Sequence, residues 1–118
     1  MTRQASIATL EPHPTGVAVL RVAGELDFHT SPQVWKVLDT VDFDLSTGLV
    51  IDGAGLTYCD STGISVFVVA YQRARVAGGS FGLAGLNREL MRLFRVVGLE
   101  NVLPFHPTIE EAVGCPRS

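Results

Sequence analysis

Short apolar segments and segments of helical periodicity alternate along most of this chain. Apolar runs or alternating patterns predict strands at residues 7–10, 17–22, 49–51, 80–84 and 101–105. Apolar residues at helical spacing, with capping residues before them, predict helices that begin near residues 31, 62, 88 and 109. The second is expected at about 62–76, and the third is capped by Asn87 and has an apolar stripe that includes Val97. Strands alternating with helices favour an α/β fold, in which right-handed crossovers place helices on a mostly parallel sheet. We therefore expect a single-layer, mixed sheet of roughly four or five strands, with an antiparallel first pair, and about four helices.

Length and charge limit the class of protein. A chain of 118 residues is long enough to bury about two-thirds of its unfolded surface in one core, so residues 1–118 are predicted to form a single domain with an ordered core at about 7–114. A net charge of -3 gives no electrostatic footprint for nucleic acid or an anionic membrane, and favours a protein partner or a small ligand. The sequence shows neither a membrane span nor a secretory signal, so a cytoplasmic protein is expected.

The cysteines and histidines do not form a metal-ligand or redox pattern. Cys59 and Cys115 are far apart in the sequence, and reduced thiols are expected for both. Cys59 fits a small core residue better than a nucleophile, because it lacks a cationic neighbour. His13, His29 and His106 are isolated, with no second His or Cys at ligand spacing. We therefore expect no metal site and no cofactor.

The segment 49–69 contains the candidate functional site. A continuous apolar run at 49–51 predicts a buried strand, and residues 64–71 show helical spacing. Between them lie a glycine-containing stretch at 53–59, expected to be a loop, and then Asp60, Ser61, Thr62 and Gly63. Asp, Ser or Thr before an amphipathic segment is typical of a helix start, because a side-chain oxygen can accept a bond from a free amide of the first turn. The Ser61 hydroxyl is therefore placed at the positive end of a helix, where the simplest interpretation is that it caps that helix.

Nucleotide binding and serine hydrolase activity both have weak support in the sequence. The sequence contains no Gly-Lys phosphate loop, and the glycines at 79, 82 and 85 do not have dinucleotide-fingerprint spacing. A serine hydrolase would use Ser61 with His29 and Asp27. The nucleophile elbow of such enzymes needs G-x-S-x-G, but Cys59 occupies the first glycine position. The charge of Asp60 beside the serine would also oppose a developing oxyanion.

Four motifs in register resemble the STAS-domain family of anti-sigma factor antagonists. Gly24-Glu25-Leu26-Asp27 with Thr30 is similar to that family's G-E-L-D-x-x-T segment. The segment 56–64, L-T-Y-C-D-S-T-G-I, is similar to its phosphorylation segment, V/L-x-F/Y-x-D-S-S/T-G-L. Two later motifs are similar to its L-F-x-x-x-G-L and S-x-E-E-A segments, at 93–99 and 109–112. Gly53 and Cys59 stand where such proteins more often carry larger residues.

The resemblance implies a phosphorylation switch. Ser61 would be the acceptor, and its kinase would be a cognate anti-sigma factor that is itself an ATP-dependent serine kinase. Unphosphorylated protein would bind that anti-sigma factor and free a sigma factor, and a PP2C-type phosphatase would reset the switch. The family arrangement brings Asp27 to the site, beside Asp60, Thr62 and Gly63. The protein would have no catalysis of its own.

The same fold leaves another non-enzymatic role open, that of an accessory subunit of a transporter or sensory complex without a phosphorylation switch. Asp60-Ser61 favours the antagonist, because accessory STAS domains need not keep the acceptor serine. Exposed positions of the second helix, such as Ser65 and Gln72, are candidates for partner contact, although plain solvated surface explains them as well.

Overall fold

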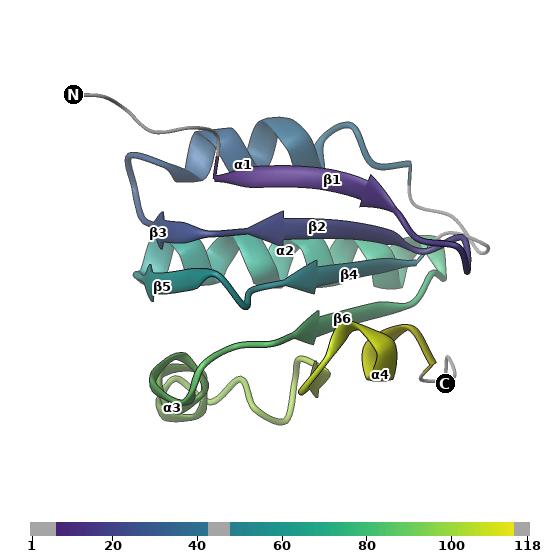
Figure 1. The fold of residues 1–118 in the computed structure, drawn as a ribbon. Helices are drawn as coiled ribbons and strands as arrows, with labels where there is room; N and C mark the ends of the chain where they lie inside the picture. The colour runs from purple at the N-terminus through teal and green to yellow at the C-terminus, as the bar shows by residue number, and fades with distance from the viewer. Residues whose placement is uncertain (1–6, 43–47, 115–118) are drawn as a thin grey trace.

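The computed structural model describes residues 7–42 and 48–114. Its elements in chain order are β1 (Ala8–Pro12), β2 (Ala18–Val22), β3 (Gly24–Leu26), α1 (Ser31–Leu38), β4 (Leu49–Asp52), β5 (Leu56–Cys59), α2 (Ser61–Ala77), β6 (Phe81–Ala84), α3 (Arg88–Val96), β7 (Phe105–His106) and α4 (Ile109–Gly114). A five-stranded sheet has the order β1-β2-β4-β6-β7, in which only β1 and β2 are antiparallel. The predicted mixed α/β sheet is therefore confirmed (Figure 1).

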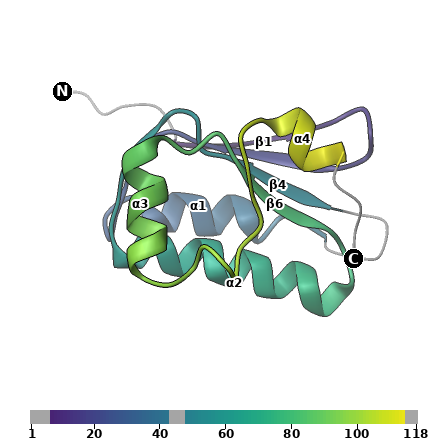
Figure 2. The same cartoon turned by 90° about the horizontal axis from the view of Figure 1, so that it is seen from below.

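The helices cover the sheet unequally. α1 and α2 lie on one face, α4 lies on the other, and α3 stands at the end toward which β4 and β6 run (Figure 2). The core lies between the sheet and the first two helices. Leu20, Ile51 and Leu83 are in register on neighbouring strands and fully buried. Phe67 of α2 and Phe94 of α3 pack against each other beneath them, with ring centroids 5.9 Å apart. No helix in the described parts of the chain is long and apolar enough to cross a bilayer.

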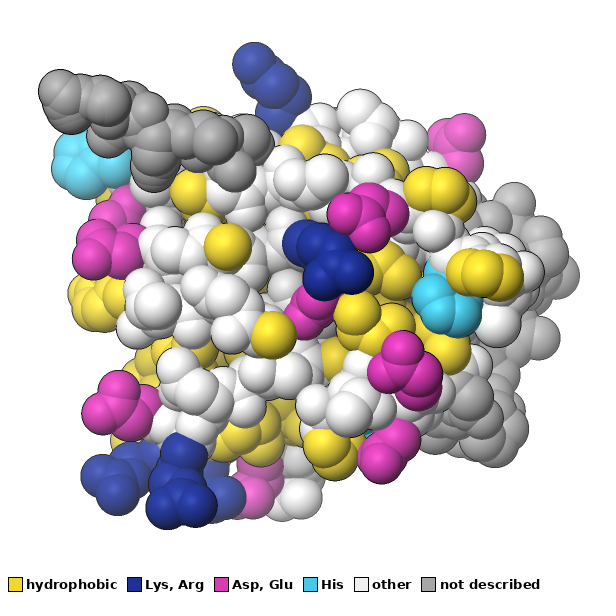
Figure 3. All heavy atoms as spheres, in the orientation of Figure 1, with side chains coloured by type: hydrophobic (Ala, Val, Ile, Leu, Met, Phe, Trp, Pro, Cys, Tyr) yellow, Lys and Arg dark blue, Asp and Glu magenta, His cyan; other side chains and the backbone are white. Residues whose placement is uncertain are grey.

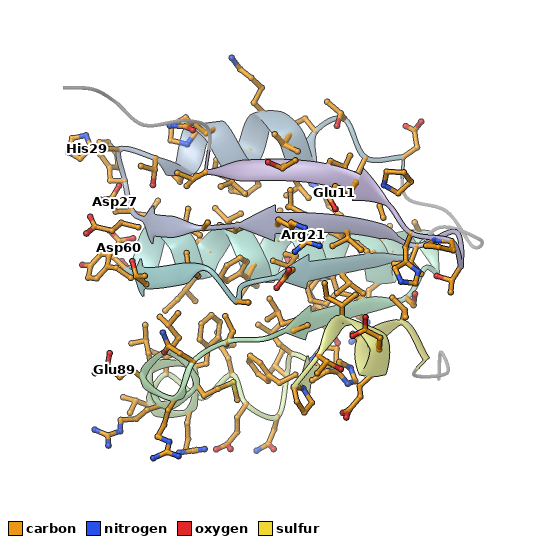
Figure 4. All side chains as sticks on the ribbon, in the orientation of Figure 1. Glu11, Arg21, Asp27, His29, Asp60 and Glu89 are labelled. Carbon is orange, nitrogen blue, oxygen red and sulfur yellow. The ribbon has the colours of Figure 1, made fainter. Side chains whose placement is uncertain are left out.

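On the other face, Arg21 of β2 joins two acidic side chains of neighbouring strands. Its guanidinium lies 3.1 Å from Glu11 of β1 and 2.5 Å from the nearly buried carboxylate of Asp52 of β4. Arg21 and Glu11 are labelled on this face in Figure 4. Figure 3 shows the same charged cluster among apolar side chains near the centre of the face. The three strands are thus linked by side chains as well as by their backbone ladder.

Two short strands were not predicted. Residues 53–59 were expected to be a loop, and the second strand was expected to stop at Ala23-Gly24. Instead, Gly24 turns the chain with a φ of +82°, and β3 then pairs in parallel with β5 in a separate two-stranded sheet. Strands of three or four residues are too short to show a period, and the flanking glycines suggest a loop. The pair continues the lines of β2 and β4 toward the start of α2 (Figure 1).

The C-terminal part differs from the prediction in two places. The last strand was expected at 101–105 but comprises only Phe105–His106. The apolar residues before it form turns, in which Leu99 O accepts from the N–H groups of Val102 and Leu103, and Leu103 is buried without being in a strand. Val97, predicted to lie on the apolar stripe of the third helix, follows α3 and is half exposed. Cys115 lies outside the described residues.

Candidate functional site

The two motif segments meet where β3 and β5 end. The strands are parallel and pair Leu26 with Cys59, and Asp60 N–H donates to Leu26 O at 3.2 Å. Asp27 and Asp60 directly follow these paired residues, so both come to the same end of the strand pair. Figure 4 shows them side by side, with His29 beyond Asp27. The β3–β5 pair, which sequence patterns missed, is therefore what brings the two acidic residues together.

Asp60 caps α2. It has extended backbone angles, and its Oδ1 accepts the Gly63 N–H at 3.1 Å while its carbonyl accepts the Ile64 N–H at 2.9 Å. The interpretation of Ser61 as the cap is thus wrong, because the Asp60 carboxylate, and not the Ser61 hydroxyl, accepts the Gly63 N–H. Ser61 is the first helical residue, with an exposed side chain, and Thr62 beside it is half-buried. Within the described residues, no hydrogen bond involves the Ser61 hydroxyl.

Asp27 holds the turn between β3 and α1. Its Oδ1 accepts the backbone N–H groups of Thr30 at 3.0 Å and His29 at 2.9 Å. The Thr30 hydroxyl accepts the Asp27 N–H at 2.9 Å and lies 2.7 Å from the Glu25 carbonyl, to which it can donate. The Thr30 N–H bond, with that of His29, lowers the pKa of the Asp27 carboxyl. These contacts give the G-E-L-D-x-x-T pattern a structural role in fixing this turn.

Gly63 lets α2 touch the strand pair. A Cβ at this position would lie 2.7 Å from Cys59 Sγ, 2.8 Å from Leu26 Cγ and 2.9 Å from the Leu26 carbonyl oxygen. There is consequently no room for a larger residue unless the helix moves. Burial, and to a smaller extent the charge of Asp60, raises the pKa of the Cys59 thiol to about 12. Cys59 is therefore a protonated core residue at neutral pH, as the sequence indicated.

The hydrolase relay is not formed. His29 uses its backbone N–H on Asp27, and its ring packs edge-on against Phe28 with centroids 5.7 Å apart. Within the described residues, no hydrogen bond joins the His29 ring to Ser61 or to the Asp27 carboxylate. The positions therefore lack the nucleophile, base and orienting-acid contacts that define a triad.

Two exposed aromatic residues at this site were not singled out from the sequence. Phe28 follows Asp27 and is 72% exposed, and Tyr58 precedes Asp60 by two positions and is 49% exposed. Burial of an aromatic residue is the usual expectation, so a pattern of residue types alone does not reveal that these two face solvent. Ser65 and Gln72, predicted to be exposed on the second helix, are both exposed on α2.

Comparison with known proteins agrees with this geometry. The family model described as the STAS domain matches residues 10–112. The anti-sigma-B factor antagonist of Listeria monocytogenes is 38% identical over 82 residues, covering 70% of this chain and 72% of that protein. That of Bacillus subtilis is 31% identical over 94 residues, covering 80% and 85%. The crystal structure of an anti-sigma factor antagonist from Mycobacterium paratuberculosis superposes with a TM-score of 0.82 at 27% identity, covering 94% of this chain and 93% of that one. The resemblance seen in the four motifs is thereby confirmed, and this chain belongs to the STAS domain family.

Proposed function

We propose that this protein is a cytoplasmic anti-sigma factor antagonist whose binding is switched off by phosphorylation of Ser61. In its unphosphorylated form it binds a cognate anti-sigma factor, which is also its serine kinase, and so frees a sigma factor. A PP2C-type phosphatase restores the binding form. The protein takes part as a binding partner and kinase substrate, with no catalysis of its own.

The main support for this proposal is that the cap of α2 and the candidate acceptor hydroxyl belong to two different residues, Asp60 and Ser61. The Asp60 carboxylate accepts the Gly63 amide, and the exposed Ser61 hydroxyl at the start of α2 makes no hydrogen bond to any residue in 7–42 or 48–114. A kinase can therefore take its proton and add phosphate without breaking the fold. Thr62 is half-buried, which favours Ser61 as the acceptor of the two adjacent hydroxyls.

The charge of a phosphate at Ser61 would act differently inside and outside the chain. Phosphorylation adds about -1.5 to -2 charges. Within the chain, the free amides and dipole at the start of α2 favour an anion there. At an interface, the phosphate joins Asp27 and Asp60 in a negative patch that must lose water. A unit charge pair at 4 Å is worth about 4 kcal/mol at an effective dielectric of roughly 20, and about 1.4 kcal/mol is tenfold in affinity. An uncompensated charge of this size at the interface is therefore enough to release a partner.

The test combines a phosphosite map of the protein from its native cells with pull-downs of variants. We expect phosphate on Ser61, an anti-sigma factor kinase retained by Ser61→Ala, and loss of that kinase with Ser61→Asp. Ser65→Ala, an exposed hydroxyl one turn later on α2, is the matched control and should behave as wild type. Absence of phosphate in all growth conditions, with identical partners for both Ser61 variants, would contradict the switch. Capture of a transporter instead would support the accessory-subunit role.

A further inference from the structure

The site carries exposed aromatic surface that the fold does not use. Phe28 is 72% exposed and Tyr58 is 49% exposed. The other aromatic side chains that the structure describes are buried or half-buried: Trp35, Phe67, Tyr71, Phe81, Phe94 and Phe105. Aromatic side chains are enriched among the residues that contribute most to protein interfaces. Their exposure at this one end is therefore informative about binding.

Both aromatic residues are held by rigid backbone. Tyr58 lies within β5, where its register partner is Glu25 of β3. Because Leu26 and Cys59 are buried toward α2, strand alternation puts Glu25 and Tyr58 on the opposite face of the pair. Phe28 lies in the turn that Asp27 closes, and its ring is packed edge-on against His29. Residues whose backbone is held in this way lose little backbone freedom on binding, which favours affinity.

Three acidic residues lie next to the two aromatic residues, along the chain or across the strand pair. Glu25 is exposed beside Tyr58, Asp27 precedes Phe28, and Asp60 follows Tyr58 by two positions. We call Glu25, Asp27, Phe28, Tyr58 and Asp60 the aromatic–acidic edge. Its charge opposes nucleic acid and anionic lipid surfaces, both of which are negative. It complements a folded protein surface in which cationic side chains ring an apolar pocket.

We infer that Phe28 and Tyr58 are the apolar anchors by which this protein docks on its anti-sigma factor, and that the docked surface of that partner is an apolar pocket ringed by Arg or Lys. The inference rests on the function proposed above and assigns separate tasks within it. The two rings supply most of the affinity by burial, which depends little on salt. The acidic residues attract the cationic ring, an interaction that salt screens. Phosphate on Ser61 opposes binding because the ring is already paired with those carboxylates, so the added charge must lose water without gaining a partner.

The experiment measures the affinity of purified variants for the anti-sigma factor kinase that Ser61→Ala retains in the pull-down. Phe28→Ala and Tyr58→Ala should each weaken binding by at least about tenfold, as expected for anchor residues. The factor should be the same at low and high salt. Glu25→Gln should have a smaller effect that shrinks as salt is raised. Val76→Ala is the matched control, because Val76 is 90% exposed near the opposite end of α2, and it should bind as wild type.

The outcomes separate the two proposals. Melting temperatures equal to that of wild type would show that the exposed substitutions leave the fold intact. If wild type binds the kinase and Ser61→Asp does not, while Phe28→Ala and Tyr58→Ala bind as wild type, the anchors are wrong and the phosphorylation switch stands. If neither wild type nor Ser61→Ala binds any anti-sigma factor kinase, the proposed function is wrong and the anchor assignment is overturned with it.

Discussion

At the scale of single residues, Asp60 caps α2, whereas the neighbouring Ser61 is the proposed phosphate acceptor. Asp60 accepts the Gly63 amide, which leaves the Ser61 hydroxyl exposed. Replacing an N-cap Asp by Ala costs about 1 kcal/mol, whereas Asn keeps an acceptor oxygen and caps about as well. We expect Asp60→Ala to lower the free energy of unfolding in urea by about 1 kcal/mol and Asp60→Asn to change it little. Equal losses would show that the carboxylate charge, not the cap bond, stabilises the helix start.

The stability of the fold should require glycine at position 63, because the site has no room for a side chain. Alanine is favoured over glycine in a helix by about 1 kcal/mol, but its Cβ would overlap Cys59 Sγ and the Leu26 carbonyl. Since a backbone oxygen cannot move aside alone, we expect Gly63→Ala to lower the free energy of unfolding by about 1–3 kcal/mol. Ser65→Ala, at an exposed position of the same helix, should stay within about 0.5 kcal/mol of wild type. A stabilised Gly63→Ala variant would mean that α2 does not touch the strand pair closely.

The Cys59 thiol should be inert in the folded protein. Burial raises its pKa from 9.0 to about 12, so the reactive thiolate is scarce at neutral pH. In a Cys115→Ser background, a thiol reagent should label Cys59 far more slowly before unfolding than after it. Because the folded pKa is the higher one, the protonated thiol adds stability that is complete below pH 9.0 and declines as pH rises toward about 12. Equal labelling rates in the folded and unfolded protein would contradict its burial.

At the scale of elements, the sequence predicted the helices that are long enough to show a period or that begin with a clear capping residue. The second helix was expected at 62–76 and spans Ser61–Ala77, and Asn87 caps α3 as predicted by accepting the Leu90 amide at 2.8 Å. The missed elements, β3 and β5, are too short for a period and exist because each pairs with a strand distant in sequence. Motif resemblance predicted Asp27 as a site residue, and the β3–β5 pairing is what places it beside Asp60.

The sheet face that lacks α1 and α2 offers a prediction at this scale. Arg21 neutralises the Asp52 carboxylate, whose side chain is only 8% exposed. Removing one partner leaves a nearly buried charge unpaired, so we expect Arg21→Met to lower the free energy of unfolding by about 1–3 kcal/mol. In Arg95→Met, the lost partner is Glu100, whose side chain is 43% exposed, and the change should be below about 1 kcal/mol. Similar losses in both variants would show that burial of Asp52 does not decide the effect.

At the scale of the whole molecule, Ser61, the residue of the proposed switch, lies outside the core, so its phosphorylation does not require the core to rearrange. The residues that fill the core, such as Leu20, Ile51 and Leu83, lie in the main sheet, whereas Ser61 begins a helix beyond the strand ends. A negative charge at that position lies at the free amides of the first turn of α2, next to the half-buried Asp27 and Asp60. The geometry therefore favours control of binding by local charge over control by refolding.

Control by local charge predicts that Ser61→Asp abolishes partner binding while leaving the fold almost unaltered. An acidic residue in the first turn of α2 interacts favourably with the helix dipole, so the free energy of unfolding should stay equal or rise by up to about 1 kcal/mol. Amide chemical-shift changes should be confined to the start of α2 and the adjoining turn at 27–30, and hydrogen exchange at Leu20, Ile51 and Leu83 should match wild type. Shift changes spread across β2, β4 and β6 would instead mean that the charge acts by rearranging the sheet. Local charge at the interface would then be insufficient to explain release.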